Sequence, residues 1–246
     1  TGDAKVVKDT RSGRIVRRTL YVNGQAVQVY VKRPRRKKSW KALADCFRRS
    51  RPLRAFRLGH QLLARRIATA LPLAAIERRV GPVLTDSILI TEAVDAPVLH
   101  NFLRTWLSPH PPASARLTAA QQRQLAQEVL WQLGRMLQRM HDCGYAHRDL
   151  KATNLLVRWT GGPHAEVVLL DLDGLGRKWV LWTKRRFQGL MRLNVSLLKC
   201  PEVNHAGRLR MLLGYLRRPG SGRIAWKAYW RVLERWSDRK LDQQIR

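Results

Sequence analysis

The stretch His147-Arg148-Asp149-Leu150-Lys151-Ala152-Thr153-Asn154 is the most informative part of this chain. It places Asp149 and Asn154 five positions apart, with Lys151 between them. Phosphoryl transfer uses this spacing, because an Asp accepts the proton of the attacking hydroxyl and an Asn holds magnesium on the phosphates. We therefore expect Asp149 to be catalytic, Lys151 to lie near the γ-phosphate and Asn154 to bind metal. The alternative is a chance H-R-D at the end of a surface helix, which further signals in the expected order disfavour.

A second acidic position follows the first along the chain. Asp171 comes 17 residues after Asn154, directly behind the largely apolar segment Glu166–Leu170. A kinase places there the Asp that binds the other side of the metal, so we expect Asp171 to be a metal ligand. Asp173, which precedes a glycine, is the alternative ligand. Asn154–Val157 and Glu166–Leu170 have the pattern of a β-hairpin that would flank the metal site.

A long amphipathic helix is predicted just before the catalytic stretch. Thr118-Ala-Ala-Gln121 is a capping box, apolar residues recur at helical spacing as far as Met140, and Gly144 is a stop signal. We expect His147 to be structural, with its ring below the loop and bonded to the backbone near Asp171. Helix, H-R-D loop, hairpin and acidic turn follow the order of a kinase C-lobe.

The N-terminal part begins with a predicted β-hairpin over Arg14–Arg33, because Asn23-Gly24 is a strong signal for a two-residue turn. Valines alternate along its second strand, so Lys32 points to the opposite face. A kinase uses a Lys on the third strand of its small sheet to neutralise the α- and β-phosphates of ATP. We expect Lys32 to have this role, with Arg33 as its nearest rival.

The segment Ser87–Asp95 reads as a strand that leads into a linker. Its position in the order of elements matches the hinge of a kinase, whose backbone groups bind the adenine edge. We therefore expect Glu92 and Val94 to belong to the ATP site.

Several features depart from a conventional protein kinase. The helix predicted over Leu53–Arg66 lacks an acidic partner for the strand lysine, since no acidic residue occurs between Asp45 and Glu77. No G-x-G-x-x-G is present near the N-terminus, where Lys8–Gly13 is the only turn. No A-P-E follows the acidic turn, so the usual peptide-binding segment is absent.

The charge balance is extreme, with 48 Lys and Arg against 17 Asp and Glu and a net charge of +31 over 246 residues. Such a positive field attracts polyanions, anionic membranes or phosphorylated substrates. The alternative is a solvated surface from an Arg-rich genome, because Arg is spread along the whole chain. A basic run at Arg33–Lys41 is either a solvated loop or a contact with an anionic surface.

The remaining composition constrains location. Cys46, Cys143 and Cys200 are far apart and odd in number, which fits a reduced intracellular compartment. No run reaches the roughly 18 apolar residues of a membrane span, and the longest, Ile67–Ile76, contains a proline. The N-terminus has no signal-peptide core and no initiator Met, so we expect a fragment of a longer chain.

Taken with these motifs, the sequence resembles the lipopolysaccharide core kinases, the Kdo/heptose (WaaP-like) family of small kinase-like enzymes. The resemblance covers most of the chain. Besides the H-R-D-L-K-A-T-N and L-L-D-L-D-G-L segments it rests on Val29–Arg33, Leu58–Leu62, Ile67–Leu73, Arg192–Ser196, Arg208–Arg210, Tyr215-Leu216 and Tyr229–Arg231.

The resemblance implies an α+β, two-lobed protein kinase-like fold. Residues 1–92 would form a small antiparallel β N-lobe, and residues 93–246 a mainly α C-lobe with a basic C-terminal extension. It also implies transfer of phosphate from ATP, with Mg²⁺, to an inner-core sugar, Kdo or heptose, of a lipopolysaccharide precursor. The enzyme would work at the cytoplasmic face of the inner membrane, as a peripheral protein.

The basic C-terminal third then has a use, because lipid A and its core are dense in phosphates and carboxylates. Residues expected to dock the acceptor or an anionic membrane are Lys184, Arg185, Arg186, Arg192, Arg217 and Arg218. Two other hypotheses stay open: an atypical Ser/Thr protein kinase, and a non-catalytic pseudokinase or polyanion-binding protein. No RNA-binding or helix-turn-helix motif is present, so no nucleic-acid partner is expected.

Overall fold

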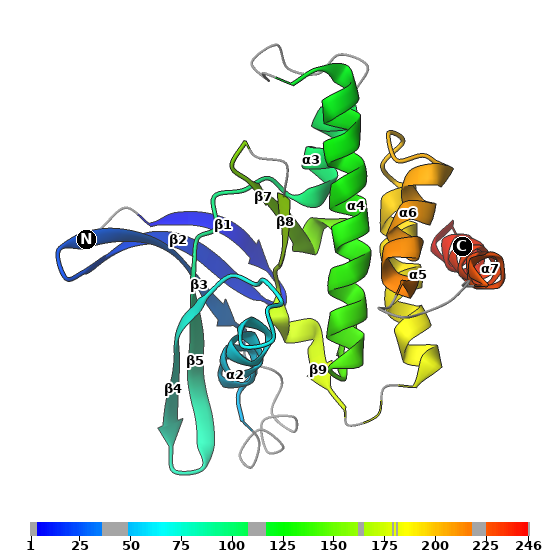
Figure 1. The fold of residues 1–246 in the computed structure, drawn as a ribbon. Coiled ribbons are helices and arrows are strands. Elements are labelled where there is room, and N and C mark those ends of the chain that lie inside the picture. The colour runs from blue at the N-terminus through cyan, green and yellow to red at the C-terminus, as the bar shows by residue number, and fades with distance from the viewer. Residues whose placement is uncertain are drawn as a thin grey trace. The chain divides into compact units, whose positions relative to one another are not determined.

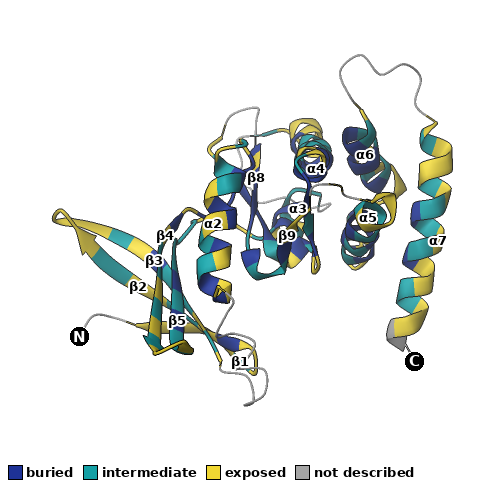
Figure 2. Ribbon diagram, turned by 90° about the horizontal axis from the view of Figure 1, so that it is seen from below, coloured by how far each residue is buried: buried dark blue, intermediate teal, exposed yellow. Residues whose placement is uncertain are grey.

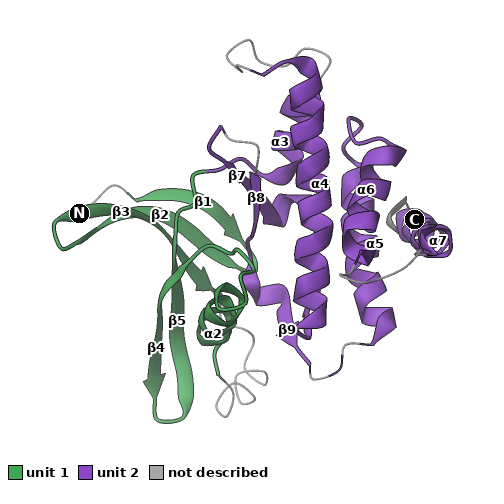
Figure 3. Cartoon of the chain, viewed as in Figure 1, with its two compact units in different colours: residues 1–95 green, residues 96–246 purple. Residues whose placement is uncertain are grey.

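The computed structural model describes residues 4–35, 49–107, 117–161, 165–178, 180, 182–217 and 225–245. The chain divides into two compact units, Thr1–Asp95 and Ala96–Arg246 (Figure 3). The first is an antiparallel sheet with one described helix, and the second is mainly helical. The predicted α+β fold class, with a β-rich N-terminal part and a helical C-terminal part, is confirmed.

The first unit is a five-stranded antiparallel sheet in the order β1-β2-β3-β5-β4 (Figure 1). Its strands are β1 (Lys5–Thr10), β2 (Gly13–Val22), β3 (Gln25–Pro34), β4 (Pro72–Val80) and β5 (Val83–Glu92). The predicted hairpin is confirmed, since β2 and β3 pair throughout and turn at Asn23 and Gly24. Both turn residues have positive φ, 50° and 77°, as a type I′ turn requires.

The register of the sheet places Lys32 on the same face as a buried residue of β5, which together with β4 contacts the helix α2 (Arg51–Leu63). Lys32 of β3 is opposite Leu89 of β5, and paired residues of antiparallel strands point to the same face. Leu89 is buried, and α2 packs on β4 and β5. Val29 points to the other face, so the alternation expected for β3 is confirmed.

The start of α2 is fixed by a carboxylate from the sheet. The Ser50 hydroxyl caps the helix by accepting from the Leu53 amide, and the Ser50 amide donates to Glu77 Oε1 at 3.0 Å. Arg79 pairs with the other oxygen of Glu77 at 3.1 Å. Partial burial raises the pKa of Glu77, but these hydrogen bonds outweigh it and hold the pKa below its usual value.

The second unit is built around one long helix. Its helices are α3 (Leu99–Leu107), α4 (Ala119–Asp142), α5 (Thr183–Leu198), α6 (His205–Leu216) and α7 (Trp226–Ile245). Its strands are β6 (Tyr145–His147), β7 (Leu155–Trp159), β8 (Ala165–Leu169) and β9 (Leu175–Arg177), with short 3₁₀ helices η1 (Ala152–Asn154) and η2 (Leu172–Gly174). β6 pairs with β9, and β7 with β8 (Figure 1).

The helix α4 is the core of this unit. Its predicted capping box is confirmed, with Thr118 and Gln121 exchanging hydrogen bonds. Leu133 and Leu137 are fully buried, and Figure 2 shows buried residues gathered on α4 and its neighbours. None of the helices among the described residues has both the length and the hydrophobicity that a membrane span requires.

Two glycines bring α4 and α6 into backbone contact. A Cβ on Gly134 of α4 would overlap the carbonyl oxygen of Met211, and one on Gly214 of α6 would overlap that of Trp131. The two helices therefore pack so closely that neither position has room for a side chain.

Gly134→Ala is expected to lower the free energy of unfolding by about 1–3 kcal/mol, because the methyl group overpacks the contact between α4 and α6. In a helix without this contact the same change usually stabilises by about 1 kcal/mol. Urea denaturation measures the difference. Gly176→Ala is the control, since a Cβ there meets nothing within 4 Å. A Gly134→Ala protein as stable as the wild type would contradict the close packing.

Candidate active site

The H-R-D loop and the acidic turn are joined by a short two-stranded ladder. β6 runs antiparallel to β9, which pairs His147 with Leu175. Beyond the ladder the Arg148 amide donates to the carbonyl oxygen of Gly174 at 2.9 Å. The segment before Asp149 and the segment after Asp171 are thus held side by side by backbone hydrogen bonds.

His147 links these two segments through its ring. The ring is 3% exposed; its Nε2 lies 2.8 Å from the carbonyl oxygen of Asp171, and its Nδ1 lies 3.2 Å from the amide nitrogen of Asp149. An amide can only donate, so Nδ1 accepts and Nε2 carries the proton. Burial lowers the pKa of His147, although the bond to Asp171 opposes the shift. The predicted structural role of this histidine is confirmed.

The acidic turn is shaped around the same ring. A Cβ on Gly174 would lie 2.7 Å from Cε1 of His147, so only glycine fits at this position. Asp171 has φ 49° and ψ 66°, in the left-handed region. Residues other than glycine rarely adopt this conformation, and Asp tolerates it better than most. The hydrogen bond from His147 to the Asp171 carbonyl holds the backbone there.

Three polar residues of the H-R-D loop contact one another. Lys151 Nζ lies 2.8 Å from Asp149 Oδ2, and the Asn154 side-chain nitrogen donates to the Asp149 carbonyl at 2.9 Å. The Asp149 side chain is 60% exposed, which leaves its carboxylate accessible to a substrate. Because the Asn154 nitrogen is occupied, the carboxamide oxygen is the group that remains for a cation.

The β7–β8 hairpin brings Asn154 to the acidic turn. Leu155 is opposite Leu169, and the Leu170 amide donates to the Asn154 carbonyl at 2.8 Å. Asn154 and Asp171 therefore lie at the same end of this hairpin, as predicted. The described residues contain no group of three or more His, Cys, Asp or Glu able to hold a metal by themselves. An amide oxygen and a carboxylate suit Mg²⁺, which takes its other ligands from water and phosphates.

The ATP-binding residues expected from the sequence belong to the first unit. Lys32 is half-buried on β3. The Glu92 carboxylate accepts from the Leu71 amide at 3.1 Å, and the next residue, Ala93, donates its amide to the Gln28 carbonyl at 2.9 Å. Val94 is half-buried. The turn between β1 and β2 consists of Arg11 and Ser12, which leaves no room for a glycine-rich phosphate loop.

The basic residues at the start of α5 divide into two groups. Lys184 and Arg185 are exposed. Arg186 is only 25% exposed and pairs with Asp142 at the end of α4, with 2.8 Å between Nη1 and Oδ1. Burial opposes ionisation of Arg186, but Asp142 and Tyr215 raise its pKa overall. Arg186 thus has a structural partner that the sequence did not indicate.

The other expected docking residues lie further along the chain. Arg192 is half-buried on α5, and Arg217 is exposed just beyond α6. Arg218 lies outside the described residues, as do Cys46, Trp179 and most of the basic run at Arg33–Lys41.

Comparison with known proteins identifies the family. The model of the lipopolysaccharide kinase (Kdo/WaaP) family matches residues 3–215. This chain belongs to that family. The predicted resemblance is therefore confirmed, and the H-R-D loop and acidic turn described above lie within the matched part of this Kdo/WaaP family member.

Two relatives of this Kdo/WaaP family member give the comparison more detail. The 3-deoxy-D-manno-octulosonic acid kinase of Xylella fastidiosa (strain M12) is 32% identical over 152 residues, which are 61% of this chain and 51% of that protein. The chain thus spans about half the length of this relative. The solved structure of WaaP in complex with acyl carrier protein is similar over 98% of this chain and 89% of its own, with a TM-score of 0.66 and 22% identity. At this identity the likeness shows the fold alone.

The structure adds a residue to which the sequence gave no role. The Ser196 hydroxyl of α5 accepts from the Ala152 amide at 2.9 Å, inside the H-R-D-L-K-A-T-N loop. The two residues are 44 positions apart, and no spacing rule connects them. Ser196 is the last residue of Arg192–Ser196, one of the C-terminal segments on which the family resemblance rests. That segment could have pointed to it.

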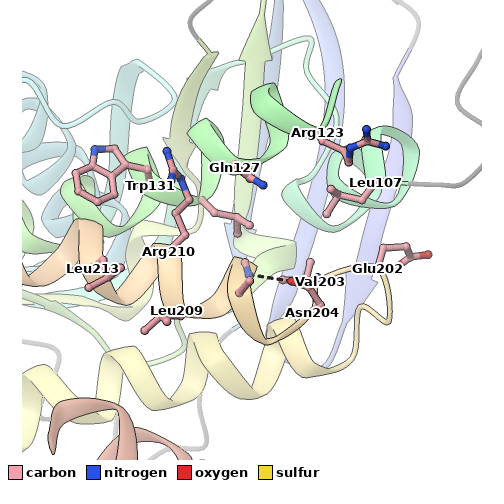
Figure 4. Close-up of a pocket in the computed structure, with 13 residues that line it drawn as sticks. Leu107, Arg123, Gln127, Trp131, Glu202, Val203, Asn204, Leu209, Arg210 and Leu213 are labelled. Carbon is pink, nitrogen blue, oxygen red and sulfur yellow. Dashed lines mark hydrogen bonds between the residues drawn. The ribbon is translucent and has the colours of Figure 1, made fainter. Parts of the chain in front are cut away.

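A separate cavity of about 320 Å³ lies between α4 and α6 (Figure 4). Three of the polar residues that line it have partners within the fold. Asn204 caps α6 by accepting from Gly207 at 3.0 Å, Glu202 pairs with Arg104 at 3.6 Å, and Arg210 lies over the Trp131 ring. None of the loop residues Asp149 to Asn154 lines it, so we assign it no part in the chemistry.

Asp171→Asn is expected to weaken binding of magnesium and ATP strongly, whereas Asp173→Asn is expected to be mild. Asp171 directly follows the hairpin end that carries Asn154, and its backbone is fixed by His147. Calorimetric titration of both variants with ATP and magnesium gives the ranking. The reverse order would move the metal ligand to Asp173.

Ser196→Ala is expected to loosen the H-R-D loop, because the Ala152 amide loses its acceptor. Hydrogen exchange of peptides covering Leu150–Asn154 should become about tenfold faster or more, since a lost hydrogen bond typically costs about 1–3 kcal/mol. Ser196→Thr keeps the hydroxyl and should restore protection, and peptides from β2 and β3 serve as internal reference. Unchanged exchange in Ser196→Ala would show that the bond does not hold the loop.

Proposed function

We propose that this chain is an ATP- and magnesium-dependent phosphotransferase that phosphorylates an inner-core sugar, Kdo or heptose, of a lipopolysaccharide precursor. One observation carries the proposal: the exposed Asp149, with Lys151 and Asn154 on it, is joined to Asp171 through the buried ring of His147. The family supports kinase chemistry. The named activity of the Xylella relative, a 3-deoxy-D-manno-octulosonic acid kinase, favours Kdo as the first acceptor to test.

The chemistry follows from the loop. Asp149 would orient the acceptor hydroxyl and take its proton as the new bond to the γ-phosphorus forms, while the bond to the bridging oxygen breaks and ADP leaves. Lys151 would neutralise charge on the transferred group. Asn154 and Asp171 would hold Mg²⁺, which offsets the charge of the phosphates. Because the transition state is loose, position and charge matter more than the strength of the base.

The first unit would supply the nucleotide contacts. We propose that Lys32 neutralises the α- and β-phosphates, and that the backbone around Glu92 and Val94 recognises the adenine edge. The described α2 contains no acidic residue, and Glu77 is already bonded to Ser50 and Arg79. Among the described residues, α2 therefore offers Lys32 no counterpart of the helix Glu of conventional protein kinases.

The acceptor would dock on exposed cations of the second unit. Lys184, Arg185, Arg192, Arg217 and Arg218 are the proposed contacts, with Arg186 in a mainly structural role. The proposed location is cytoplasmic, peripheral at the inner face of the inner membrane. The solved WaaP was captured with acyl carrier protein, so an acyl carrier protein is a partner to add in the same assay.

Transfer of labelled γ-phosphate to deep-rough lipopolysaccharide tests the proposal. Asp149→Ala should lower the rate by about 10²–10⁴-fold, because a positioned base is lost, while ATP binding persists. Asp242→Ala, an exposed carboxylate on α7, is the matched control and should transfer normally. Near wild-type turnover by Asp149→Ala would reject the catalytic assignment. Labelling of a basic protein instead of lipopolysaccharide would favour an atypical protein kinase.

A further inference from the structure

The segment between β9 and α5 exposes two large apolar side chains. Val180 is 68% exposed and Trp182 is 74% exposed, the highest values for large apolar residues in the described part of the second unit. The next, Tyr229, is 39% exposed. Trp179 and Leu181 lie outside the described residues. Two apolar side chains this exposed, two positions apart in the sequence, indicate an interaction site.

The segment is fixed near the end of α4 by the bond of Lys178 to Gly144 on one side and by the ion pair of Arg186 with Asp142 on the other. The Lys178 amide donates to the Gly144 carbonyl at 2.9 Å, and the Trp182 carbonyl accepts from the Arg185 amide at 2.9 Å. A Cβ on Gly144, whose φ is 80°, would overlap the Lys178 carbonyl, so the backbones touch. With Arg186 bonded to Asp142, the apolar side chains are presented from a fixed base.

Cations flank the apolar pair on both sides. Arg177 and Lys178 precede it, Lys184 and Arg185 follow it, and all four are exposed. The sequence contains no acidic residue between Asp173 and Glu202. The chain on both sides of Val180 and Trp182 is therefore positive, which favours an anionic partner.

We propose that this segment, defined by Arg177, Lys178, Val180, Trp182, Lys184 and Arg185, inserts into the headgroup layer of an anionic phospholipid bilayer. Trp prefers the membrane interface. An apolar tip with basic flanks is the pattern of peripheral insertion, and each Lys or Arg near an anionic leaflet strengthens the attraction to it. A protein partner would be selected by shape, whereas this segment offers two exposed apolar side chains with two exposed cations before them and two after them in the sequence.

The insertion would bring the proposed phosphoryl transfer to the membrane surface. This consequence rests on the proposed function. β9 ends at Arg177, next to the segment, and pairs with β6, which ends two residues before Asp149. The H-R-D loop is thus connected to the inserted segment by one short ladder. A sugar hydroxyl on a membrane-linked acceptor would meet Asp149 without leaving the bilayer surface.

Vesicle sedimentation tests the proposal. The wild type should bind vesicles of phosphatidylglycerol and phosphatidylcholine in equal parts, and bind pure phosphatidylcholine at least about tenfold more weakly. The double variant Val180→Ser, Trp182→Ser should lose at least about tenfold in partitioning to the anionic vesicles, from lost apolar insertion. Tyr21→Ser is the matched control, because Tyr21 is 77% exposed on the β2–β3 hairpin, and it should bind as the wild type.

The outcomes are separable from those of the catalytic proposal. Asp149→Ala should bind vesicles as the wild type does, because its fold and its basic segment are unchanged. A wild-type protein that binds vesicles but transfers no phosphate would reject the kinase activity and leave the insertion intact. Normal binding by the double variant, or by Val180→Asp alone, would overturn the insertion. Equal binding to neutral and anionic vesicles, or no binding by the wild type, would overturn it as well. Circular dichroism melts confirm that each variant is folded.

Discussion

The neutral imidazole of His147 is the constraint on which the site depends. One ring nitrogen accepts from the amide of Asp149 and the other donates to the carbonyl of Asp171. A charged ring would carry a proton on both nitrogens, and the one at Nδ1 would face another donor. Burial disfavours that charge, so the same packing that hides the ring also preserves the geometry of both loops. The hydrogen bond from this ring holds the left-handed backbone of Asp171, and the ring leaves no room for a side chain at Gly174.

The helices hold that ring and its loops in place with buried polar groups as well as apolar contacts. Ser196 of α5 bonds to the loop, and Asn194, two residues earlier, donates to Ser237 of α7 at 2.9 Å. Arg208 of α6 is buried, and burial lowers its pKa. It lies over the Trp230 ring at 5.5 Å, where the aromatic face offsets part of the desolvation cost. Polar side chains thus link α5 to the H-R-D loop, and link α5 and α6 to α7.

Local signals in the sequence predicted the parts that are decided locally. The Asn23-Gly24 turn and the capping box at Thr118 each depend on a few neighbouring residues, and both predictions are confirmed. The H-R-D spacing is equally local, and the catalytic and metal-binding roles read from it stay predictions. The structural role of His147 followed from the order of elements. These features identified the kinase-like fold and most of the loop in the second unit.

Features decided by distant contacts were missed. The strand β4, which begins at Pro72, was considered only as part of an apolar run. The pairing of Arg186 with Asp142 and of Ser196 with Ala152 each joins residues 44 positions apart. Such contacts follow from how helices pack, which composition and periodicity do not specify. The net charge of the sequence predicted an anionic partner. It did not show which basic side chains are used in ion pairs within the fold.

The helix α7 lies beyond the family match but belongs to the packed core of the second unit. The family match ends at residue 215, yet Leu233 and Ser237 of α7 are buried, and Ser237 bonds to Asn194 of α5. Domain limits drawn from the family alone would cut off a helix that covers α5 and would turn its interior residues into surface. The folding unit is therefore longer than the part that the family model matches, and α7 belongs to its core.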